Sequence, residues 1–176
     1  MHYPVPSHLR TLLAIDQTKC AEHEVFGSVI CPCGSGTLCL LHVADRIEGE
    51  GPPFLRVTEH GGHFFLRVGG KCISCGKEHL LFDCDMHGWN GYVCSDERIR
   101  RIPRPPFSEW SCHRCQSSHH HIALSIRGED MQFALGEGEG ILTPTDWFEG
   151  FGWFTVYVTC ASCHCGPTMI MDYETM

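Results

Sequence analysis

Four pairs of closely spaced cysteines constrain this chain more than any other feature. Each pair lies between two apolar runs, the pattern expected when a tight turn joins two strands. One stretch shows this clearly, because apolar residues at 64–66 and 68 lead into Cys72, Cys75 and Gly76, and residues 80–82 lead out. The two sulfurs of such a turn point to one side, so two turns that meet in space can surround one metal ion.

The spacing of the pairs predicts two sets of four sulfur ligands. They are Cys31, Cys33, Cys72 and Cys75 in the first set, and Cys112, Cys115, Cys160 and Cys163 in the second. Zinc prefers four sulfur or nitrogen ligands at tetrahedral angles. The glycines after Cys33 and Cys75 fit turns that need a positive φ. Four neighbouring residues are alternatives for a fourth ligand: Cys39, His42, His164 and Cys165.

Each half of the chain resembles the zinc-ribbon, rubredoxin-like class in its two cysteine turns and their flanking strands. The resemblance implies two structural zinc ions and a hairpin topology. It does not extend to the long insertions, and it implies no function, because zinc ribbons occur in proteins of many kinds.

The order strand, cysteine pair, strand, insertion, strand, cysteine pair, strand occurs twice and predicts an internal duplication. We therefore expect a mostly β protein made of two zinc-ribbon-like halves. Residues 7 to about 20 predict one short N-terminal helix with Ser7 as its cap. Residues 98–106 contain three prolines and four arginines and predict an extended linker without regular structure. The predicted domains are residues 1–96 and 110–176, separated by a linker at 97–109.

Composition favours a cytoplasmic protein. The 13 cysteines are an odd number, and the N-terminus lacks the pattern of a secretory signal, so metal-bound thiolates are a better interpretation than disulfides. The formal net charge is −8, and eight thiolates with two Zn²⁺ ions would make it −12. An acidic surface of this size repels phosphate backbones and argues against general nucleic-acid binding.

An enzymatic role finds little support in the sequence. Catalytic zinc keeps an open coordination position, whereas four thiolates close the coordination shell. In the run His119 to His121, successive residues of a strand face opposite ways, so at most His119 and His121 share a face, and a half-exposed strand is a simpler interpretation than a metal site. A thiol redox switch is an alternative, in which Cys165 displaces a neighbouring ligand on oxidation.

We therefore expect a zinc-stabilised binding or regulatory module that acts on a protein partner, as an adaptor, an inhibitor or an accessory subunit. The candidate partner contacts are Trp89, Arg98, Arg100, Arg101 and Arg104. The arginines can equally bridge the two acidic halves, or bind nucleic-acid phosphates, which is the alternative function. The polar loop at residues 83–91 is a weaker candidate site, because it offers acid and base groups but no nucleophile.

Overall fold

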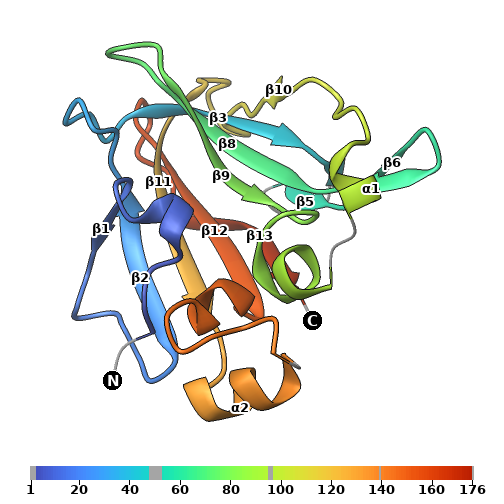
Figure 1. Ribbon diagram of the computed structural model, residues 1–176. Helices are drawn as coiled ribbons and strands as arrows, with labels where there is room; N and C mark the ends of the chain where they lie inside the picture. The colour runs from blue at the N-terminus through green and yellow to red at the C-terminus, as the bar shows by residue number, and fades with distance from the viewer. Residues whose placement is uncertain (1–2, 48–52, 95–96, 139, 176) are drawn as a thin grey trace.

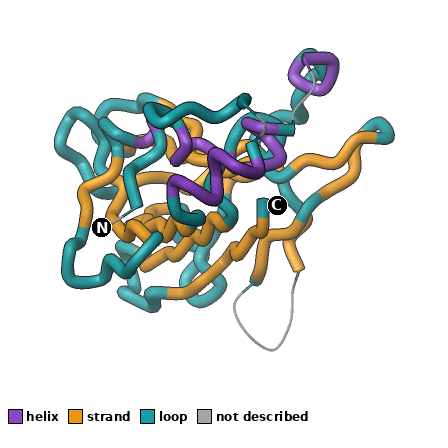
Figure 2. The backbone as a smooth tube through the Cα atoms, turned by 60° about the horizontal axis from the view of Figure 1, so that its bottom comes forward, coloured by secondary structure: helices purple, strands orange, loops and turns teal. Residues whose placement is uncertain are grey.

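The computed structural model describes residues 3–47, 53–94, 97–138 and 140–175. These residues form a mostly β structure, which confirms the predicted fold class. The strands are β1 (Leu13–Ile15), β2 (Glu24–Val29), β3 (Leu38–Val43), β4 (Asp45–Ile47), β5 (Phe54–Arg56), β6 (Thr58–His60), β7 (His63–Phe65), β8 (Arg67–Cys72), β9 (Glu78–Asp83), β10 (Ser108–Glu109), β11 (His119–Arg127), β12 (Trp153–Cys160) and β13 (Thr168–Glu174). The helical segments are η1 (Ser7–Leu9), η2 (Trp89–Val93), α1 (Glu97–Arg100), α2 (Met131–Glu137) and η3 (Trp147–Gly150). Figure 2 shows the helical segments gathered on one side of the strands.

Two antiparallel meanders, β3-β8-β9 and β11-β12-β13, form the framework (Figure 1). They meet where β3 and β11 pair over two residues, His119 with Cys39 and His120 with Leu38. Both meanders use the same register. Leu38 pairs with Cys72 in the first meander and His120 pairs with Cys160 in the second. Each meander also has a β-bulge that begins four residues before that cysteine, at Val68/Gly69 and at Val156/Tyr157.

The strand that precedes the first cysteine turn of each cluster pairs with the meander that carries the other cluster. β2, which precedes Cys31, pairs with β11. β10, which precedes Cys112, pairs with β3. Strands from both sides of residues 97–109 therefore belong to one sheet. The matching registers are what an internal duplication would produce, and both the duplication and the domain boundaries stay predictions.

One hydrophobic core includes residues of both meanders. Phe82 of β9 and Phe154 of β12 are fully buried, and their rings stack with centroids 4.6 Å apart. Phe151 packs against both rings. Aromatic side chains bury a large apolar area, so this contact between the meanders is a major source of stability.

The N-terminal helical segment is shorter than predicted, because it ends at Leu9 and the strand β1 follows it. Residues 13–15 pair antiparallel with residues 27–29 of β2, and the backbone N–H of Ile30 donates to the carbonyl oxygen of Leu12. Pairing with β2 thus overrides the helical spacing of the leucines, which was a weak signal over so short a segment.

The arginine-rich segment also differs from the prediction of irregular structure. A single helical turn, α1, occupies residues 97–100. It ends before Pro103, whose ring cannot continue a helix. None of the helices among the described residues is long and apolar enough to span a membrane.

Candidate metal centres

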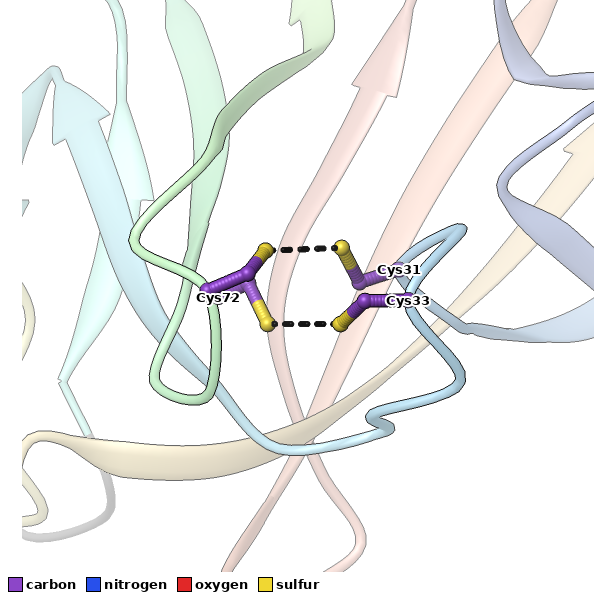
Figure 3. Close-up of side chains that lie close together, drawn as sticks. Cys31, Cys33 and Cys72 are labelled. Carbon is purple, nitrogen blue, oxygen red and sulfur yellow. Dashed lines mark hydrogen bonds between the residues drawn. The ribbon is translucent and has the colours of Figure 1, made fainter.

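The structure brings the eight predicted cysteines together in two clusters of four. In each cluster the sulfurs lie within 4.8 Å of one another. In the first, Cys31 Sγ lies 3.6 Å from Cys75 Sγ and Cys33 Sγ lies 3.5 Å from Cys72 Sγ. Figure 3 shows Cys31 and Cys33 on one turn facing Cys72 on the other. In the second, the matching distances are 3.7 Å from Cys112 to Cys163 and 3.5 Å from Cys115 to Cys160.

These separations fit a tetrahedral metal site. With Zn–S bonds of about 2.3 Å, tetrahedral geometry places two sulfurs about 3.8 Å apart. In each cluster, one cysteine of every turn is buried and the other is exposed. The clusters therefore lie at the surface, with four sulfurs placed as a closed shell. Each can hold one metal ion.

All four cysteine turns share one backbone feature. The residue after the second cysteine has a positive φ in every one: 93° at Gly34, 73° at Gly76, 59° at Gln116 and 57° at His164. The values at Gly34 and Gly76 confirm the role predicted for these glycines. His164 is the turn residue itself and is exposed, which explains why its side chain lies outside the four-sulfur cluster.

At Cys72 and Cys112, backbone N–H groups of the turns favour the thiolate form that a metal requires. For Cys72, the N–H groups of Cys75 and Ser74 lower the pKa to about 6. For Cys112, burial raises the pKa, but hydrogen bonds from the N–H groups of Cys115 and Arg114 and from the thiols of Cys165 and Cys163 together lower it to about 6. Hydrogen bonds to a charged form stabilise that form.

The other ligand alternatives differ in position. Cys39 Sγ lies 3.8 Å from Ser118 Oγ, and His42 is buried with its ring edge-on to Trp110; neither belongs to a cluster of potential ligands. Cys165 lies beside the second cluster, with its Sγ 3.4 Å from the sulfurs of both Cys112 and Cys163.

Two histidines near the clusters were not predicted from the sequence as candidate ligands. His79 Nε2 lies 3.3 Å from Cys31 Sγ. It is four residues beyond Cys75, a spacing that carried no metal signal by itself. His113 groups with Cys112 and Cys165 within 4.8 Å. In the histidine run, His119 and His121 are exposed and His120 is buried, which confirms the predicted alternation.

The predicted partner contacts are spread over the loop and the arginine-rich segment. Trp89 begins η2 and is half-buried, and its backbone N–H donates to the carbonyl oxygen of Phe151. Arg98 and Arg101 are exposed, and the side chain of Arg100 lies outside what the structure describes.

Arg104 turns toward the first half of the chain. Its Nη2 donates to Asp85 at 3.3 Å and its Nε lies 3.7 Å from Asp83. The 83–91 loop is thus tied to the arginine-rich segment. Arg104 therefore contacts carboxylates of the first half, and the role of the arginines as a bridge between the halves stays a prediction.

The chain matches no protein-family model, no curated protein and no solved structure. The interpretation of the two clusters therefore depends on their own geometry and chemistry.

Proposed function

We propose that this protein is a zinc-stabilised module that binds a protein partner and performs no chemistry at its metal ions. The observation that carries the proposal is the completeness of both sulfur clusters. Four thiolates fill a tetrahedral shell, and zinc without an open position serves structure rather than catalysis. The free energy of metal binding then contributes directly to folding.

The charge of the module favours a partner with a basic surface. The chain has a formal net charge of −8, which becomes −12 when eight thiolates hold two Zn²⁺ ions. Complementary charge raises association rates and suppresses wrong partners. The same charge opposes phosphate backbones, and Arg104 is engaged with Asp83 and Asp85. A nucleic-acid partner is therefore the less favoured alternative.

The hairpin of β6 and β7 offers a surface for such contacts. Figure 1 shows it extending away from the body of the molecule. Phe64 of β7 exposes 60% of its surface. It lines a hollow of about 300 Å³ together with Ile99, Cys94 and Tyr173. Exposed aromatic side chains beside a hollow are typical anchors of protein interfaces.

The proposal is tested by quantitative binding with zinc-loaded protein. Immobilised wild type and Phe64→Ser are used to capture partners, which are identified by mass spectrometry and then purified. Titration calorimetry with the purified partner should give a Kd that weakens at least tenfold in Phe64→Ser. Phe133→Ser is the matched control, because Phe133 of α2 is 46% exposed.

Two outcomes would contradict the proposal. One is tight binding of DNA or RNA with a steep dependence on salt, which would favour the nucleic-acid alternative. The other is a folded protein that contains no metal after purification without chelators.

A further inference from the structure

The shared register of the two meanders allows their metal clusters to be compared position by position. Leu38 pairs with Cys72 as His120 pairs with Cys160. Pro32 follows Cys31 as His113 follows Cys112. Where the first cluster has two apolar neighbours, the second therefore has two imidazoles. The second cluster also has a fifth thiol, Cys165.

His120 is buried in a way that leaves a lone pair without a partner. The side chain is 1% exposed. Its Nδ1 donates a hydrogen bond of 3.0 Å to the carbonyl oxygen of Ser118, so Nε2 is the unprotonated nitrogen of the neutral ring. Within the described residues, Nε2 has no hydrogen-bond partner. A buried acceptor without a partner destabilises the fold, a penalty that leucine at this position avoids.

A hydrogen bond from Nδ1 to a backbone carbonyl is the arrangement that orients a metal-binding histidine. It fixes the tautomer and presents Nε2 as the ligand atom. His120 lines a cavity of about 10 Å³ together with Cys112, His113 and Cys165. This volume is close to that of one water-sized occupant.

The other members of this cavity already form a potential ligand set. One ligand atom from each of Cys112, His113 and Cys165 lies within 4.8 Å of the other two, and His120 lines the same cavity but lies outside this 4.8 Å cluster. Cys112 Sγ lies 3.4 Å from Cys165 Sγ and 3.7 Å from Cys163 Sγ, so it adjoins both the tetrathiolate cluster and the cavity. Two sulfurs and two imidazole nitrogens are a typical tetrahedral set for zinc.

We propose that the second cluster binds two metal ions, with Cys112 as a bridging thiolate. The first ion has the four-cysteine shell. The second has Cys112, His113 and Cys165, which are already clustered, and takes His120 Nε2 as its fourth ligand through a shift of the imidazole ring toward them. This inference rests on the proposed zinc binding by the tetrathiolate. The chain then carries three zinc ions, one in the first half and two in the second.

Metal stoichiometry tests the proposal. The protein is loaded with zinc, dialysed against metal-free buffer and measured by plasma mass spectrometry together with amino-acid analysis. We expect three ions per wild-type chain, and two in Cys165→Ser and in His120→Leu. The leucine variant introduces the residue that the first half has at this position, so it should fold. Cys94→Ser and His119→Ala, which alter an exposed cysteine and an exposed histidine outside both clusters, should keep three ions.

Cadmium-113 NMR gives an independent readout. The three-ion protein should give two resonances typical of four sulfurs and one typical of mixed sulfur and nitrogen, with coupling between two of them through Cys112. His120→Leu should remove the mixed resonance alone. Two ions in the wild type, with Cys165 freely alkylated in the folded protein, would overturn the second ion and leave the proposed function intact. Fewer than two ions would overturn both.

Discussion

Replacing Asp83 by asparagine tests how much its buried carboxylate contributes to stability. This carboxylate contacts Arg67 of the same meander and Arg104 of the arginine-rich segment. Asp83 is 1% exposed, and its Oδ2 accepts a hydrogen bond of 2.9 Å from Arg67 Nε. Its Oδ1 accepts the backbone N–H of Asp85 at 3.0 Å. Asparagine keeps the volume and can keep the second bond. It removes the charge and turns an NH₂ group toward Arg67.

The structure sets the magnitude of the expected loss. Removing one partner of a buried ion pair costs about 3–5 kcal/mol, because the other charge stays buried. Arg67 and Arg104 are 16% and 14% exposed, so water relieves part of this penalty. We expect a loss of about 3 kcal/mol for Asp83→Asn. Asp172 occupies the matching position of β13, but it is exposed, and its Oδ1 accepts a hydrogen bond of 2.6 Å from Thr155 Oγ1. Asp172→Asn should cost less than about 1 kcal/mol.

Urea unfolding of the zinc-loaded proteins at pH 7 measures the difference. With a slope of about 2 kcal/mol per molar urea, 3 kcal/mol moves the midpoint by about 1.5 M. Zinc content is measured in parallel, so that metal loss is not mistaken for a weaker ion pair. Equal midpoints for the two variants would refute the reasoning, because the buried pair would then contribute no more than an exposed hydrogen bond.

Three further changes have distinct expected outcomes. Cys72→Ser should lower the zinc content by at least one ion per chain, and excess chelator should unfold the wild type as followed by circular dichroism; an unchanged zinc content would argue against Cys72 as a ligand. Burial lowers the pKa of His8 below 6.5, so its contribution to stability is complete above pH 6.5 and is lost as pH falls through the pKa of the folded state. His8→Phe, which keeps a ring against His87, should therefore flatten the decline of urea stability between pH 6.5 and 5, and an unchanged slope would speak against this role. Gly128→Ala should cost about 1–3 kcal/mol because the new methyl group overlaps the buried Tyr3 ring, whereas Gly136→Ala in α2 meets open space and should be neutral or stabilising by up to about 1 kcal/mol; thermal melting of both variants should separate them.

The eight cysteines were predictable because their signal is local. A cysteine pair between two apolar runs specifies its own turn, and Gly34 and Gly76 report the backbone that the turn needs. The pairing of turns followed from the equal order of elements in both halves. The strand at residues 119–127 was predictable as well, because a histidine run followed by apolar residues fits a half-exposed strand. The structure shows exposed and buried histidines alternating there.

The remaining features depend on partners that are distant in sequence. Helical spacing in residues 7–20 competes with β2, and only the folded chain shows that pairing prevails over residues 13–15. His79 lies next to Cys31 because β9 returns alongside β8 and places it there. The orphan nitrogen of His120 depends on burial by elements from both halves. No local pattern contains this information.

The strands β2 and β10, which precede Cys31 and Cys112, couple the stability of the two metal centres. The turn that carries Cys31 follows directly from a strand held by β11, and the turn that carries Cys112 follows one held by β3. In each centre, one cysteine turn is therefore attached to a strand that pairs with the other meander. Loss of an ion from one centre weakens that strand pairing and so destabilises the meander that carries the other centre. Chelation should then strip the protein in a single cooperative step, so that partly metallated chains are scarce at any chelator concentration.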